Sequence, residues 1–90
     1  MAVGRVTIVN KLGLHARAAA KFIQVSKSFP CTVQLGHDES SLVNGKSIMN
    51  IMTLGAAEGT ELVLQTQGDE SEQAYKQLSE LIDSRFGEQE

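Results

Sequence analysis

The stretch from Asn10 to Phe22, NKLGLHARAAAKF, most constrains what this chain can fold into. Before it, apolar and polar residues alternate from Val3 to Val9, and this period of two predicts a β-strand. Within the stretch, a glycine-bearing turn leads into an alanine-rich run whose apolar residues recur at helical spacing. The chain should therefore pass from a strand through a loop into a helix that begins at or just after His15.

His15 would then lie at a helix start, where backbone N–H groups are unpaired and the helix dipole is positive. Phosphate binds readily at such positions, and the positive end should keep the imidazole neutral and nucleophilic near pH 7. The N–H groups of Ala16 and Arg17 could hold a phosphoryl group on the ring, and the Arg17 guanidinium can reach the same oxygens. A histidine near a helix start is often only a cap or a solvated side chain. Here histidine, arginine, glycine and helix onset coincide, which favours a functional role.

The rest of the chain alternates between the same two periodicities. The first helix should run to about Ser28, because Pro30 forbids its continuation. Strands are predicted over 31–35, near 41–43 and over 61–65, each followed or preceded by turn residues. A last helix should cover 71–86, and the tail over 87–90 should be frayed.

A short helix is predicted over 47–54, before Gly55. It should turn Ile48 and Ile51 inward, where Met52 could join them, and leave Met49 exposed. The order strand, helix, two strands, helix, strand, helix has no internal repeat and no linker. It predicts one α+β domain over residues 1–90, with helices on one face of a sheet.

The composition excludes several classes of protein. The net charge is −3 and aromatic residues make up 4% of the chain, which argues against a nucleic-acid-binding protein. No apolar run is long enough to span a membrane, and the N-terminus does not resemble a signal peptide. The lone Cys31 has no disulfide partner and no neighbours at metal-ligand spacing. We expect a cytoplasmic protein without a metal or another cofactor.

The charge is unevenly distributed along the chain. The first third contains no Asp or Glu, and its basic residues could steer phosphate and acidic partners towards His15: Arg5, Lys11, Arg17, Lys21 and Lys27. The last third is rich in acidic residues.

Two motifs, GLHAR at 13–17 and GKSIMNIMTLGA at 45–56, resemble the HPr family of bacterial phosphocarrier proteins, and the likeness covers essentially the whole chain. The resemblance implies an open-faced βαββαβα sandwich, with a four-stranded antiparallel sheet and three helices on one face. It also implies that His15 takes a phosphoryl group on its Nδ1 (pros) nitrogen and that Arg17 stabilises this group. The donor would be an enzyme I-type protein that uses phosphoenolpyruvate, and the acceptor a histidine of an enzyme IIA-type protein.

The motif holds no second acid–base group beside His15, so we expect a stoichiometric carrier rather than a turnover enzyme. The family commonly has proline after the arginine, whereas this chain has Ala18. HARAAAKF at 15–22 and the acidic C-terminal part look more like the nitrogen-related branch, NPr, than like the sugar-transport HPr. Two alternatives remain: a sugar-transport HPr, and a regulatory module of the same fold that acts only by docking.

By the same resemblance, the short helix lies beside His15 and docks both donor and acceptor. The implied docking residues are Leu14, Ala20, Ile48, Met49 and Met52. Ser47 has two interpretations: a helix N-cap, worth about 1 kcal/mol, or a regulatory phosphorylation site in species that have the matching kinase. The first explains the residue without further assumptions. His37 in a turn is assigned no role, and we expect a monomer without nucleic-acid or membrane partners.

Overall fold

The computed structural model describes residues 1–89, which form one four-stranded sheet and the helices packed on it. The elements follow one another in the predicted order βαββαβα: β1 (Ala2–Thr7), α1 (Ala16–Ser26), β2 (Thr32–Gly36), β3 (Val43–Asn44), α2 (Ile48–Met52), β4 (Glu61–Gln67) and α3 (Ser71–Asp83). A 3-10 turn, η1 (Arg85–Gly87), follows α3. The predicted α+β class is therefore confirmed.

The sheet has the strand order β1-β4-β2-β3, and all neighbouring strands are antiparallel. The last strand in sequence, β4, thus lies between β1 and β2, and the short β3 forms an edge. The register pairs Val6 with Leu62 and Arg5 with Val63. Because side chains alternate along a strand, Val6 and Leu62 point to the same face and are buried there, whereas Arg5 is exposed.

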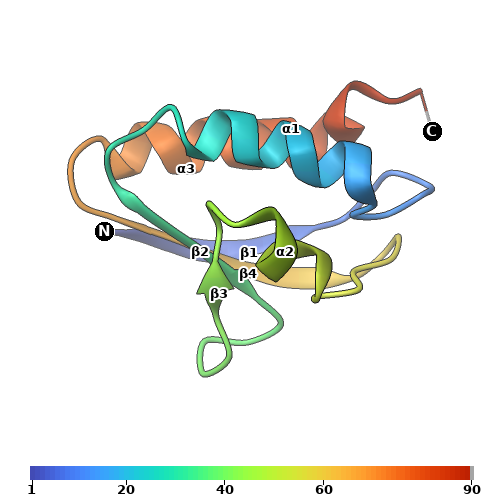
Figure 1. Ribbon diagram of the computed structural model, residues 1–90, viewed down its shortest axis with the longest axis horizontal. Coiled ribbons are helices and arrows are strands. Elements are labelled where there is room, and N and C mark those ends of the chain that lie inside the picture. Colours follow the sequence, from blue (N-terminus) through green and yellow to red (C-terminus); the bar gives the residue numbers. More distant parts are fainter. Residues whose placement is uncertain (90) are drawn as a thin grey trace.

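Helices α1 and α3 lie side by side over one face of this sheet, and the short α2 lies next to α1 and β3 (Figure 1). The two long helices present apolar stripes to the strands, with Phe22 from α1 and Leu78 and Ile82 from α3 fully buried. From α2, only Ile51 enters this core. The helical stripes and the alternating strand residues form a single core between the two layers.

Several predicted boundaries are wrong by one to three residues. α1 ends at Ser26 rather than Ser28, and α3 ends at Asp83 rather than Phe86. After α3 the backbone of Arg85 and Phe86 is left-handed, with φ of 61° and 55°, which no continuing helix can contain. β2 and β3 begin one or two residues later than predicted, at Thr32 and Val43.

The predicted faces of α2 are partly wrong. Ile51 is fully buried and Met49 is 74% exposed, as expected, but Ile48 is 41% exposed and Met52 40% exposed. A helix of five residues makes little more than one turn, so it can direct only one large side chain into the core. Ile48 therefore lies on the surface and not beside Ile51 in the core.

Candidate functional site

The loop before His15 is held in place by its own amide and carbonyl groups and by the segment after α2. The Asn10 side chain donates from Nδ2 to the carbonyl of Gly13 (2.7 Å), and the Leu14 N–H donates to the carbonyl of Ala56 (2.8 Å). Gly13 has φ of +70°, and a Cβ atom there would lie 2.6 Å from the carbonyl oxygen of Ala56. Only glycine fits this position, so the loop delivers His15 in one defined geometry.

His15 is the N-cap residue of α1. Its backbone is extended (φ −81°, ψ 178°), and its carbonyl accepts the first bond of the helix, from the N–H of Ala19 (2.8 Å). The N–H groups of Ala16, Arg17 and Ala18 come before that of Ala19 and have no carbonyl acceptor within the helix. Such unpaired N–H groups at a helix start are where a helix binds anions. The His15 side chain is 26% exposed, so the ring lies at the surface next to the positive helix end.

Glu88 is a neighbour of His15 that the sequence motif did not indicate. Its Oε2 atom is hydrogen-bonded to His15 Nε2, and its Oε1 atom accepts from Asn10 Nδ2 (3.0 Å). The Glu88 side chain is only 14% exposed. The prediction of a frayed tail over 87–90 is therefore wrong for Glu88, while Glu90 lies outside the described residues. Phe86, an apolar residue close to the C-terminus, is the only sequence signal that this segment is anchored.

The Glu88 carboxylate lies in a polar and positively charged environment. Its removal from water acts to raise the pKa, but the hydrogen bonds from Asn10 and His15 and the positive charges of protonated His15 and of Lys21 together lower the pKa of Glu88 below its ordinary value. The carboxylate is thus ionised at neutral pH. An ionised carboxylate can only accept hydrogen bonds.

Arg17, the second residue of α1, is exposed and lines a surface cavity of about 420 Å³. The other residues around this cavity are Lys11, Leu12, Glu88 and Gln89. The structure therefore brings Arg17 to the same hollow as Glu88, beside the helix start. A guanidinium here can meet the oxygens of a phosphoryl group.

The predicted docking residues divide into two groups. Ala20, Ile48, Met49 and Met52 are exposed, on helices α1 and α2 that contact each other. Leu14 is only 6% exposed and belongs to the core, so its prediction as a docking residue is wrong. Leu12, which is not among the predicted docking residues, is 70% exposed in the loop before His15.

Ser47 is the N-cap of α2. Its hydroxyl accepts a hydrogen bond from the Asn50 N–H (3.3 Å), as expected for a serine at a helix start. The side chain is half-buried. His37, to which no role was assigned, is hydrogen-bonded through Nε2 to the carbonyl of Leu54 (2.8 Å).

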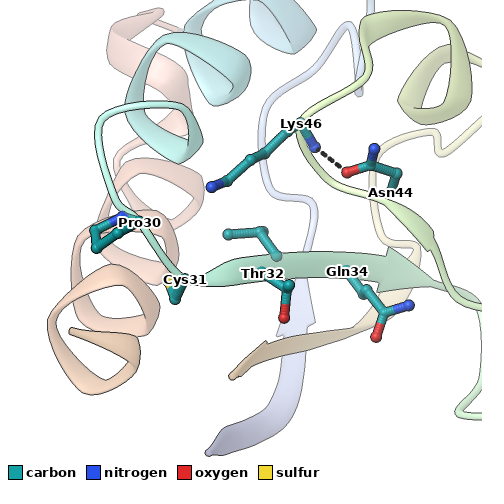
Figure 2. A pocket seen from close by; sticks show the side chains of 7 residues that line it. Pro30, Cys31, Thr32, Gln34, Asn44 and Lys46 are labelled. Atoms are coloured by element: carbon teal, nitrogen blue, oxygen red, sulfur yellow. Dashed lines mark hydrogen bonds between the residues drawn. The ribbon is translucent and has the colours of Figure 1, made fainter. Parts of the chain in front are cut away.

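A second cavity of about 450 Å³ lies beyond the opposite end of α1, between the start of β2 and β3 (Figure 2). Lys46 lies at its rim, with its N–H bonded to Asn44 Oδ1 (2.9 Å) and its Nζ bonded to the Phe29 carbonyl (2.7 Å). Cys31 in its wall is 2% exposed, which suits a small apolar core residue rather than a nucleophile. This cavity lacks the combination of histidine, arginine and helix start found at His15.

Neither a metal centre nor a membrane span is found in the part of the chain that the structure describes. No three of its His, Cys, Asp and Glu residues form a group that could hold a metal ion. Among residues 1–89, no helix is both long enough and apolar enough to cross a bilayer.

Known protein families, curated proteins and solved structures include clear relatives of this chain. The family described as "PTS HPr component phosphorylation site" matches residues 3–84. The chain is 53% identical over 85 residues to the phosphocarrier protein HPr of Pseudomonas aeruginosa, and the match covers 94% of both proteins.

Two solved structures from Thermoanaerobacter tengcongensis are also similar. HPr-C-His has a TM-score of 0.93 and 42% identity, with 100% of both chains covered. An HPr dimer has a TM-score of 0.75 and 44% identity, with 92% of this chain and 94% of that chain covered. The chain therefore belongs to the HPr family of phosphocarrier proteins of the phosphotransferase system.

Proposed function

We propose that this protein carries a phosphoryl group on Nδ1 of His15. It accepts the group from an enzyme I-type protein, which takes it from phosphoenolpyruvate, and passes it to a histidine of an enzyme IIA-type protein. One observation carries the proposal: His15 is the N-cap of α1 and is partly exposed, so a group on its ring meets the positive helix end. The protein acts as a stoichiometric carrier and not as a turnover enzyme.

The chemistry required is mainly positioning and stabilisation of charge. The backbone N–H groups of Ala16 and Arg17 bind the phosphoryl oxygens, because they precede the first bonded turn of α1. The Arg17 guanidinium, which lines the adjacent cavity, supplies further donors.

The docking surface for both partners consists of Leu12, Ala20, Ile48, Met49 and Met52, which are exposed around the start of α1 and on α2. Flexible thioethers such as those of Met49 and Met52 suit a surface that meets more than one partner. Ser47 caps the same helix, so a phosphate on its hydroxyl would place negative charge beside this surface without unfolding the helix. We propose it as a regulatory position where a matching kinase exists.

Within the family, we assign the protein to the nitrogen-related branch. HARAAAKF at 15–22, with Ala18 in place of the common proline, and the acidic last third support this assignment. We expect a monomer, although three similar structures are of dimers. Gel filtration with light scattering tests the oligomeric state directly.

The test of the carrier function is incubation with phosphoenolpyruvate and a purified enzyme I-type protein, followed by mass spectrometry. We expect one acid-labile phosphoryl group on the wild type and none on His15→Ala, whose fold should be intact because His15 lies at the surface. His37→Ala is the matched control and should be phosphorylated like the wild type.

Phosphate that remains on His15→Ala would contradict the assignment. Partner binding without any phosphorylation of the wild type would favour the docking module instead. The initial rates with enzyme I-type proteins of the nitrogen-related and sugar branches decide the branch, and a faster rate with the sugar-branch donor would contradict our assignment.

A further inference from the structure

The C-terminal segment after α3 turns back towards His15 through three consecutive left-handed residues. Arg85, Phe86 and Gly87 have φ of 61°, 55° and 78°. The Phe86 side chain is fully buried, and its carbonyl accepts a hydrogen bond from Lys21 Nζ of α1 (2.6 Å). These two anchors of Phe86 determine where the chain leaves the core, so Glu88, two residues further on, is directed to the loop before α1.

The Glu88 carboxylate is oriented by a buried amide. Asn10 is fully buried, and its Nδ2 donates both to the Gly13 carbonyl and to Glu88 Oε1. Both of these partners are acceptors, so only the Nδ2 end of the amide can face them. With Oε1 held in this way, Oε2 is left for Nε2 of His15.

This hydrogen bond restricts the protonation of the His15 ring. Since the ionised carboxylate carries no proton, the proton between Oε2 and Nε2 must belong to the ring. In a neutral imidazole only one nitrogen bears hydrogen, so Nδ1 then holds the lone pair. Among the described residues, Nδ1 makes no hydrogen bond that would compete with a reaction there.

We propose that Glu88 is a positioning residue for phosphoryl transfer, which holds His15 in the tautomer that leaves Nδ1 nucleophilic. The proposal rests on the carrier function of His15. It goes beyond the family match, because the matched residues 3–84 do not include Glu88. Aspartate or glutamate on the second nitrogen of a histidine is a recurring way to select the tautomer and orientation of the ring.

The transfer step balances without an additional proton acceptor. The Nδ1 lone pair forms a bond to the phosphorus of the phosphorylated enzyme I-type donor, and the bond from phosphorus to the donor breaks with its electron pair remaining on the donor. The proton on Nε2 stays in place. The ring becomes positively charged, and this charge faces the Glu88 carboxylate, while Arg17 at the same cavity meets the phosphoryl oxygens.

The first test is the tautomer of His15, read from the ring ¹⁵N chemical shifts and long-range ¹H–¹⁵N couplings of the unphosphorylated protein at a pH where the ring is neutral. We expect the wild type to show the Nε2–H form, Glu88→Ala to show a mixture of both tautomers, and Glu88→Gln to lie between them. Glutamine has a single amide oxygen: when this oxygen accepts from Nε2, the contact lacks the negative charge and the amide NH2 group faces Asn10 Nδ2, which then loses its acceptor. Gln89→Ala is the matched control, because Gln89 lines the same cavity without bonding to His15.

The second test is the single-turnover rate of phosphorylation by a phosphorylated enzyme I-type donor. We expect Glu88→Ala to be about tenfold slower than the wild type, at the lower end of the loss seen when the carboxylate partner of a metal-bound histidine is removed. Glu88→Gln should be intermediate, and Gln89→Ala should stay within about twofold. The phosphorylated wild type should carry the group on Nδ1, which the ³¹P and ring ¹⁵N shifts distinguish from Nε2.

A merely structural role makes a different prediction. In that case Glu88→Ala would lower the unfolding temperature but leave both the tautomer ratio and the transfer rate unchanged, and the proposal would be overturned. It would also be overturned by a changed tautomer ratio with an unchanged rate, or by phosphate on Nε2 of the wild type.

The two proposals fail separately. If the wild type accepts no phosphate on His15, the carrier function fails, while the tautomer measurement still reports on the contact between Glu88 and the ring. If His15 is phosphorylated normally in Glu88→Ala, the carrier function stands and the role of Glu88 does not.

Discussion

Each nitrogen of the His15 ring has a distinct environment in this protein. Nε2 is hydrogen-bonded to Glu88, and the backbone of His15 caps the positive end of α1. Neither contact alone is unusual, since histidines often cap helices and often bond to carboxylates. Their combination leaves one nitrogen for the phosphoryl group and places anion-binding N–H groups beside it.

We predict that Arg17→Ala slows phosphoryl transfer by about a hundredfold, because the substitution removes the guanidinium that donates charge-assisted hydrogen bonds to the phosphoryl oxygens. Stability should change little, since Arg17 is exposed. Arg17→Lys should be intermediate because lysine keeps the charge but loses the planar fork. Single-turnover kinetics and thermal melts measure both effects.

The control for Arg17 is Lys27→Ala, which removes an equal charge at the far end of α1. It should transfer within about twofold of the wild type, because its charge is far from His15 and screened by salt. Equal losses in the two variants would show that Arg17 acts only through the overall charge of the protein.

At the scale of one element, α2 shows how a helix too short to be stable alone can form a docking surface. Ser47 caps its start and Ile51 fixes it to the core, and the other large side chains are left exposed. The helix can thus present Ile48, Met49 and Met52 to partners without contributing them to the fold.

We therefore predict that Met49→Glu weakens binding to both the donor and the acceptor by about tenfold or more, with no loss of thermal stability. A carboxylate at this position would be buried without a partner in either complex. Ser47→Asp, which carries part of the charge of a phosphate, should weaken donor binding in the same direction but less. Binding titrations and melts on the same samples measure both effects.

Ile51→Ala is the comparison for Met49→Glu, because Ile51 lies in the same helix and is fully buried. It should lower the free energy of unfolding by about 3 kcal/mol, as expected for a large aliphatic side chain removed from a core. If Met49→Glu instead destabilises the protein like Ile51→Ala, the faces of α2 have been assigned the wrong way round.

At the scale of the whole molecule, the core does not end with the last helix. Phe86 follows α3 by three residues, in a turn of its own, yet it is fully buried with the side chains of the two layers. The C-terminal turn therefore belongs to the sandwich. Its packing supports the position of Glu88 beside His15.

We predict that Phe86→Ala lowers the free energy of unfolding by about 3–4 kcal/mol, a large part of the total for a domain of this size. Urea unfolding followed by circular dichroism measures the change. Leu12→Ala, at a side chain that is 70% exposed, should change stability by less than about 0.5 kcal/mol. A Phe86→Ala protein as stable as Leu12→Ala would mean that the turn is not packed on the core.

Much of the fold could be predicted because the decisive patterns are local. The alternation of apolar and polar residues from Val3 to Val9, and the helical spacing of apolar residues after His15, depend only on which nearby residues lie on the same face of an element. Patterns of this kind predict the order of the elements. The capping role of Ser47 and the place of His15 at the helix start are local in the same sense. Helix ends were less predictable, because Arg85 and Phe86 adopt left-handed backbone conformations that no residue type there requires.

The element order, the family and the position of His15 and Arg17 at the start of α1 follow from local sequence patterns. The burial of Leu14, the exposure of Ile48 and the contact of Glu88 with His15 across 73 residues of chain depend on how the folded layers pack. Periodicity cannot assign the faces of a five-residue helix. Periodicity also carries no information on contacts between segments that are distant in the sequence. Such contacts depend on how the layers pack and, here, on the position at which buried Phe86 holds the C-terminal segment.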